Sequence, residues 1–489
     1  MPSYLLEIIV LSLGLILLVI EAFTAPKHKG WIASTAIFVL VLTLVLLFFA
    51  KQGFGEENRE LSRFYAWDPM ARFFRGFAIV ATILTLFLAL DYRKVLARFT
   101  ANPDSEDGTG EYYCLLLFAC AGMMWMASAK DLVSLFVSLE LTTITFYVLV
   151  AYMRRSVGSL EAGVKYLILG ALSTGFLVYG IAWIYGATGT TDLALIAEQI
   201  KGGEMASETS TYLLFGLALL LISLAFKIGA VPMHVWIPDV YQGSPTPTTA
   251  FLSIASKAAG FAITIRVVEP FLAGGGDLAV KATFILAVLA GATILLGNLA
   301  AIPQKNFKRL LAYSSIANAG FLLMPLAAWQ TGADDLTSKE VIMVYLAIYL
   351  VTTFAAFFVL SIIHRNTGSD EISAFEGLAD RQPKLALMTA VIIGALAGLP
   401  LTAGFWGKFL AFKTAIAGEL WIPVILGFVG VAAGFYYYFQ IIRAMYWRNS
   451  LEETPLKVSA ISLYAVTTLT IVTVILGVWP QPVLWLFGS

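Results

Sequence analysis

The chain has 489 residues, of which 59% are hydrophobic and 13% are charged, and its 31 Lys and Arg residues balance 31 Asp and Glu residues. A soluble domain carries roughly 25% charged residues, so this composition excludes a soluble globular enzyme. The net charge of zero argues against nucleic acid as a partner. The expected surroundings of the chain are therefore a lipid bilayer.

Many apolar segments are long enough to cross that bilayer, since a membrane helix needs about 20 residues to cross a hydrocarbon core of roughly 30 Å. Hydropathy predicts about fourteen such helices and hence an all-α polytopic membrane protein. The predicted spans are residues 3–23, 31–50, 70–90, 111–128, 131–152, 160–185, 211–236, 246–269, 279–301, 307–328, 340–364, 385–416, 421–447 and 457–479.

Lys and Arg residues in the short loops predict the orientation. If the N-terminus is outside, about fifteen of them fall on the inner side and about seven on the outer side, as the positive-inside rule requires. Both termini are then expected outside, which in a bacterial inner membrane is the periplasmic side. The acidic loops 56–60 and 198–208 also fall outside.

Two cysteines, Cys114 and Cys120, are too few for a disulfide framework or a four-thiolate cluster. The sequence also has no glycine-rich nucleotide-binding motif. We therefore expect no metal site and no cofactor in this chain itself.

The seventh and twelfth spans are interrupted in similar ways. Pro232 follows Lys227 in the seventh, and Pro400 precedes Lys408 in the twelfth, each with glycines nearby. Proline removes a backbone donor and breaks or kinks a helix. In lipid the freed carbonyl groups need partners from protein or water, so such breaks are expected beside a hydrated cavity.

The two breaks lie five helices apart, which predicts a repeat. Because five is odd, two copies made of spans four to eight and nine to thirteen would have opposite topology, the pattern of ion-coupled transporters. The predicted segments are 1–110 with the first three helices, 111–270 and 271–448 with the two repeats, and 449–489 with the last helix. The alternative is that glycine and proline are simply common in membrane helices.

Four ionisable residues lie deep inside apolar spans, where a charge costs on the order of 2.5–3.5 kcal/mol. They are Glu140, Lys227, Lys257 and Lys408. Burial favours the neutral form of an amine, so such a lysine can load and release a proton. We expect Glu140 and Lys227 to form a coupled switch, with Lys257 and Lys408 as the next carriers. A structural ion pair combined with snorkelling is the alternative.

Other charged residues have more open interpretations. Lys165 either joins the relay or pairs with Glu161 one helical turn earlier. His234, at the break of the seventh span, either passes protons or bonds to freed carbonyl groups. Glu7, Glu21, Glu269 and Arg266 lie near span ends, where we expect them to reach the interface. Hydroxyl groups such as that of Thr143 are expected to hold bridging waters.

At these motifs the sequence resembles the antiporter-like membrane subunits of respiratory complex I, and within them the N-type group. The resemblance rests on residues 224–247 around Lys227, 251–260 around Lys257, 298–316, and 398–408 ending at Lys408. It covers essentially the whole chain. In M-type relatives the twelfth helix carries a glutamate, so Lys408 favours the N-type group.

The resemblance implies an inverted-repeat fold in which Glu140, Lys227, Lys257 and Lys408 match the family's essential glutamate and lysines. It implies a proton-translocating membrane subunit of an NADH-quinone oxidoreductase in the bacterial inner membrane. FMN, iron–sulfur clusters and quinone would all be bound by partner subunits. The implied partners form a hetero-oligomer that includes K-type and M-type membrane subunits.

Two rival functions remain from the residues alone. A subunit of a cation/proton antiporter complex would share this fold, and carboxylate and hydroxyl oxygens would then bind a cation. A non-conducting scaffold would tolerate loss of the buried lysines without loss of proton pumping.

Overall fold

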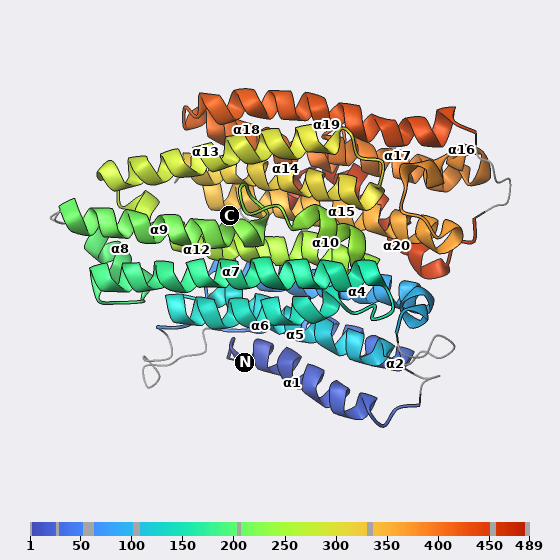
Figure 1. The fold of residues 1–489 in the computed structure, drawn as a ribbon, viewed down its shortest axis with the longest axis horizontal. Helices are drawn as coiled ribbons and strands as arrows, with labels where there is room; N and C mark the ends of the chain where they lie inside the picture. Colours follow the sequence, from blue (N-terminus) through green and yellow to red (C-terminus); the bar gives the residue numbers. More distant parts are fainter. Residues whose placement is uncertain are drawn as a thin grey trace. The chain divides into compact units, whose positions relative to one another are not determined.

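The computed structural model describes residues 2–25, 29–51, 63–100, 108–202, 207–329, 336–449 and 456–484. The acidic loop 56–60 and part of the loop 198–208 lie outside the described residues. The described chain is almost entirely helical (Figure 1).

The helices follow one another along the chain with the following bounds: α1 (Leu5–Glu21), α2 (Gly30–Phe49), α4 (Pro69–Arg98), α5 (Thr109–Ser128), α6 (Leu132–Val150), α7 (Val157–Thr188), α8 (Leu193–Lys201), α9 (Ser207–Ile228), α10 (Ile237–Gly243), α11 (Thr246–Phe251), η3 (Leu252–Ser256), α12 (Lys257–Ala273), α13 (Gly276–Ala301), α14 (Phe307–Ala328), α15 (Ser338–Thr367), η4 (Ile372–Phe375), α16 (Leu378–Arg381), α17 (Pro383–Ala397), α18 (Ala403–Ala417), α19 (Trp421–Trp447), α20 (Ala460–Val478) and α21 (Gln481–Leu484).

Twelve of the described helical segments are long and apolar enough to cross a membrane, which confirms the all-α polytopic class. The predicted spans 3–23 and 385–416 are not among the twelve. The first is α1, which has 17 residues, and the second is divided between α17 and α18, which have 15 residues each. The chain is therefore a multi-pass membrane protein.

The predicted breaks occur in both spans. In the seventh, α9 ends at Ile228 and residues 229–236 form turns before α10 begins. In the twelfth, α17 ends at Ala397 and α18 begins at Ala403. Gly398 between them has a φ of 93°, a left-handed conformation that glycine adopts without steric cost.

The chain forms two compact units. The first comprises residues 1–228 and 243–283, and the second comprises residues 229–242 and 284–489. In the first unit α5 packs against α1, α4 and α6, and α7 packs along α9. In the second, α15 packs against α14, α17, α18 and α20. The first three predicted spans thus lie in the same unit as α5–α9.

Close helix packing in the second unit depends on small residues. A Cβ atom added to Gly297 of α13 would lie 2.5 Å from the backbone nitrogen of Ala317 in α14. Glycine at this position therefore allows the two backbones to approach, as is common between membrane helices.

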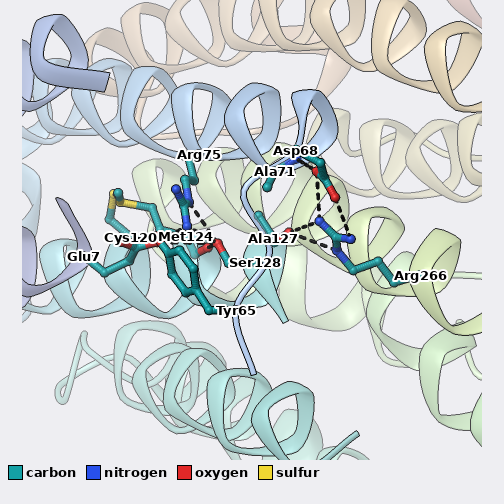
Figure 2. Close-up of polar contacts among 10 residues, drawn as sticks. All are labelled: Glu7, Tyr65, Asp68, Ala71, Arg75, Cys120, Met124, Ala127, Ser128 and Arg266. Atoms are coloured by element: carbon teal, nitrogen blue, oxygen red, sulfur yellow. Dashed lines mark hydrogen bonds and ion pairs between the residues drawn. The ribbon is translucent and has the colours of Figure 1, made fainter. Parts of the chain in front are cut away.

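A buried ion pair holds the N-terminal helices of the first unit together (Figure 2). Glu7 of α1 and Arg75 of α4 both have fully buried side chains, and Arg75 Nη2 lies 2.9 Å from Glu7 Oε1. Arg75 also donates to Ser128 Oγ and lies over the rings of Tyr65 and Trp67. The expectation that Glu7 reaches the interface is therefore wrong, because the carboxylate is neutralised inside the helix bundle.

Arg266 on α12 is anchored in a similar way (Figure 2). Its Nη1 atom lies 3.0 Å from Asp68 Oδ2, and its Nε atom donates to the carbonyl oxygen of Ala127 at 3.1 Å. Glu21 is also buried and pairs with Lys29. The expectation that Arg266 and Glu21 reach the interface is therefore wrong, because each has a partner within the fold.

The turns that precede α6 and α14 have matching hydrogen bonds. Leu132 donates to the Thr191 carbonyl and Leu193 to that of Lys130, beside α7. Phe307 likewise donates to the Asp370 carbonyl and Ile372 to that of Lys305, beside α15. Both α7 and α15 end in threonine followed by a left-handed glycine, Gly189 or Gly368. Because α6 and α14 are the predicted fifth and tenth spans, this match supports our proposal that 111–270 and 271–448 are repeats.

A second buried charge cluster lies at the start of α14. Lys308 Nζ lies 3.2 Å from Asp370 Oδ2, and His364 Nδ1 lies 2.7 Å from Asp370 Oδ1. Burial raises the pKa of Asp370, but the neighbouring Lys308 charge and the His364 contacts outweigh it and hold the pKa below its usual value of 3.8. The cluster therefore links α14 to the segment after α15 through a carboxylate that stays ionised.

This cluster predicts that the stability of the folded chain decreases at acidic pH. Because the pKa of Asp370 is lower in the folded chain than in the unfolded chain, its contribution is complete above about pH 4 and is lost as the pH falls towards the folded value. We expect the thermal unfolding midpoint of the detergent-solubilised chain to decrease as the pH drops below about 4. Asp370→Asn should lower the midpoint at neutral pH and flatten its dependence on pH. Asp277→Asn, which changes an exposed carboxylate, should leave the curve unchanged.

Candidate functional site

Glu140 lies near the middle of α6 and is half-buried. Thr174 of α7 donates a hydrogen bond to Glu140 Oε1 at 2.7 Å. Sequence reasoning missed Thr174, although two adjacent hydroxyl residues, Ser173 and Thr174, in an apolar helix are a usable signal. This hydrogen bond ties the Glu140 side chain of α6 to α7.

Lys227 lies in the last turn of α9, and its side chain is almost completely buried. Its Nζ atom donates to Thr143 Oγ1 and lies 5.6 Å from the centre of the Phe226 ring. Thr143 follows Glu140 by three residues, so both share one face of α6. The described residues include no direct ion pair between Glu140 and Lys227, but the carboxylate is near enough to act electrostatically on the amine. Glu140 and Lys227 are thus separated, and each has a hydroxyl group beside it.

Lys257 is the first residue of α12 and is only 2% exposed. It directly follows η3, a π-helical segment inside the predicted eighth span. Such segments are frequent at functional sites, because they re-aim side chains within a helix. A Cβ atom added to Gly260 would lie 3.4 Å from Lys227 Cβ, so this turn of α12 packs directly against the end of α9. Two of the predicted lysines therefore lie on helices in contact.

Lys408 lies on α18, after the break in the twelfth span. Its Nζ atom donates to the carbonyl oxygens of Leu396 at 3.1 Å and Ala397 at 2.7 Å. These carbonyls belong to the last turn of α17, which lacks intrahelical partners. The amine thus satisfies the backbone groups that the break releases, and its positive charge suits the negative end of the α17 dipole.

A small cavity of about 20 Å³ adjoins Lys408, and the polar residues Asn318 and Tyr345 form part of its lining. The Tyr345 hydroxyl donates to Asn318 Oδ1 at 2.6 Å. A polar cavity needs roughly 10–15 Å³ to hold one water molecule, so this one suits a single bridging water. Asn318 was not predicted from the sequence, although an amide side chain is uncommon in an apolar helix and could have identified it.

Further hydroxyl groups extend the polar surroundings of α14. The hydroxyls of Ser314 and Tyr438 are hydrogen-bonded to each other, and Tyr437 donates to Asn298 Oδ1 at 3.3 Å. Tyr437 and Tyr438 are 2% and 1% exposed. Polar groups this deep in a membrane protein need such partners, because lipid offers none.

Lys165 and His234 have different surroundings. Lys165 pairs with Glu161 at 2.8 Å on an exposed face, which favours local pairing over a place in the relay. His234 lies half-buried among the turns of residues 229–236 and interacts with the Pro232 backbone. Its Nδ1 atom is buried and has no hydrogen-bond partner among the described residues.

The first unit brings Glu140, Lys227 and Lys257 together, whereas Lys408 and His234 belong to the second unit. Each lysine is on or beside an irregular helical segment, and hydroxyl or amide groups surround the buried charges. The buried ionisable groups of this site are an acid and amines, which are groups that can bind and release protons.

Comparison with known sequences places this site in context. The family described as NADH:quinone oxidoreductase/Mrp antiporter, TM matches residues 129–434. NADH-quinone oxidoreductase subunit N of Heliobacterium modesticaldum is 40% identical over 481 residues, which cover 97% of this chain and 96% of that protein. The subunit N of Desulforamulus reducens is 37% identical over 97% of this chain and 95% of its own length.

Solved structures have the same fold over nearly the whole chain. A chain of respiratory complex I from Thermus thermophilus with bound Aureothin has a TM-score of 0.77 and 32% identity, covering 98% of each chain. A chain of the membrane-bound sulfane sulfur reductase, an archaeal respiratory membrane complex, has a TM-score of 0.83 and 26% identity, covering 99% of this chain and 96% of that one.

Proposed function

Because this chain belongs to the NADH:quinone oxidoreductase/Mrp antiporter transmembrane family, and within it to the subunit N group, we propose that it is a proton-translocating membrane subunit of an NADH-quinone oxidoreductase. Redox energy released in partner subunits would drive the translocation. The observation that carries this proposal is the burial of Lys227 and Lys257 on helices in contact, beside the half-buried Glu140.

The proposed mechanism is a change in the distance between Glu140 and Lys227. When the carboxylate approaches, it stabilises the protonated amine, and when it withdraws towards Thr174, the amine releases its proton. Lys227 would pass this proton through Lys257 to Lys408, from which it leaves. The separated arrangement, with Thr174 on the acid and Thr143 on the amine, supports the second state.

The energies involved are compatible with this switch. Moving one charge against 100 mV costs about 2.3 kcal/mol. A change of one pKa unit corresponds to about 1.4 kcal/mol, so a change of one to two units in a carrier is sufficient. Hydrogen-bond rearrangement around one acid–amine pair supplies energies of this size.

The remaining parts of the enzyme would lie in other subunits. We propose that FMN, iron–sulfur clusters and quinone are bound there, since the sequence offers no motif for them. K-type and M-type membrane subunits are the proposed neighbours in the hetero-oligomer. The excess of Lys and Arg on one set of loops supports a bacterial inner-membrane location with both termini on the periplasmic side.

Replacement of the acid tests the proposal. We expect Glu140→Gln in the assembled complex to reduce NADH-driven proton translocation in vesicles at least tenfold, because a neutral amide no longer stabilises the protonated amine. Glu161→Gln is the matched control, since this carboxylate is 60% exposed and pairs only locally. Equal pumping by the Glu140→Gln variant and the unaltered complex would refute the proposal.

The same preparation separates this function from cation/proton antiport. An antiporter would need sodium or potassium ions for proton movement and would not need NADH. We expect proton uptake to depend on NADH and quinone and to be independent of sodium. Both relatives are named as NADH-quinone oxidoreductase subunits, which supports NADH-driven proton translocation over cation/proton antiport.

A further inference from the structure

A cavity of about 850 Å³ in the second unit has none of Glu140, Lys227, Lys257 and Lys408 in its lining. It opens between the C-terminal half of α19, the loop that precedes α14, and the segment that contains η4. Its charged lining residues are Lys305, Arg443, Arg448 and Glu371. Three basic side chains thus face one acidic side chain.

Two of the basic residues are available to a ligand. Arg448 Nη1 lies 2.9 Å from Glu376 Oε1, and the acidic Glu371 accepts a hydrogen bond from Asn306 at 3.3 Å. Within the described ranges, by contrast, no carboxylate lies within 4.0 Å of Lys305 or Arg443. The cavity therefore offers two cationic groups to an anion.

The wall of the cavity on α19 is aromatic and faces outward. Phe435, Tyr436 and Phe439 are 38%, 60% and 56% exposed, and all three line the cavity. Trp447, at the end of this membrane-spanning helix, is 67% exposed. Because exposed tryptophan marks the membrane–water boundary, Arg443 one turn earlier lies at the depth of lipid headgroups.

We propose that this cavity binds an anionic phospholipid, with its phosphodiester headgroup between Lys305 and Arg443 and its acyl chains along Phe435 and Phe439. A free phosphate ion would fill only a small part of 850 Å³ and would leave the aromatic wall uncovered. The loop positions put the cavity on the inner side under the positive-inside rule, where basic groups attract anionic lipid. This proposal does not depend on the proton relay.

Native mass spectrometry of the purified full chain tests it. Phosphatidylglycerol and phosphatidylcholine with the same acyl chains would be titrated against the unaltered chain and against the double variant Lys305→Gln/Arg443→Gln. Each basic residue near an anionic lipid contributes roughly a factor of five. We expect the double variant to bind phosphatidylglycerol about 30-fold more weakly and phosphatidylcholine unchanged.

Three further arms make the result decisive. Lys384→Gln/Lys457→Gln removes two exposed charges from outside the cavity and should leave binding unchanged. Lys305→Arg/Arg443→Lys keeps both charges and should retain binding, which separates lost charge from faulty folding. Excess inorganic phosphate should not displace the lipid. Equal losses for both lipids or for both Gln variants would overturn the proposal, as would displacement by phosphate.

Discussion

Replacing Lys257 with methionine should abolish proton translocation while the complex still assembles and oxidises NADH. The substitution keeps a flexible side chain of similar length, so the packing of α12 against α9 should persist. Without the amine, a proton must pass position 257 as a charge in hydrocarbon, which costs about 2.5–3.5 kcal/mol. This cost would slow proton transfer at that position about 100-fold. Proton uptake by vesicles during NADH oxidation measures the effect.

The matched control is Lys281→Met, which removes an exposed lysine of α13 that pairs with Asp277 in the same helix. Its pumping should equal that of the unaltered complex. Full pumping by the Lys257→Met variant would instead favour the scaffold function, in which the buried amines only complete the fold. Failure of both variants would point to a general loss of assembly, which gel filtration of the complex detects.

Replacing Arg75 with methionine should destabilise the chain by about 3–5 kcal/mol, because it leaves the Glu7 carboxylate buried without its partner. Both side chains are fully buried, so solvent offers no replacement for the lost contact. The free energy of unfolding of the full chain in mixed micelles measures this change.

The double variant Glu7→Leu/Arg75→Met completes the cycle. Removing both charges should recover most of the lost free energy, since an apolar pair of similar volume is often neutral or stabilising. Lys165→Met, which breaks an exposed pair, should cost less than about 1 kcal/mol. If the double variant is as unstable as Arg75→Met, packing around the guanidinium rather than charge neutralisation is the main contribution of this residue.

The helical fold was predictable because hydrophobicity alone determines which segments enter a bilayer. The predicted spans 307–328 and 421–447 have the bounds of α14 and α19. The short α8 was not predicted, because nine residues are too few to give a membrane signal. Both broken spans were predictable, since proline removes a hydrogen bond wherever it lies in a helix.

The candidate site was predictable in its charges and not in its contacts. A lone lysine in an apolar span stands out because its burial is costly, which identified Lys227, Lys257 and Lys408. Thr174 and Arg75 act through partners on other helices, and such pairs depend on packing that no local pattern encodes. The same reason explains why Glu7 was expected at the interface although it pairs inside the bundle.

The contacts of Lys408 make the chemistry of one amine inseparable from the shape of a helix. Its protonated form closes the open end of α17 by bonding to two carbonyl groups. Loss of the proton weakens that closure, because the cation no longer attracts the negative end of the helix. The geometry of the broken twelfth span is therefore tied to the charge on a single side chain.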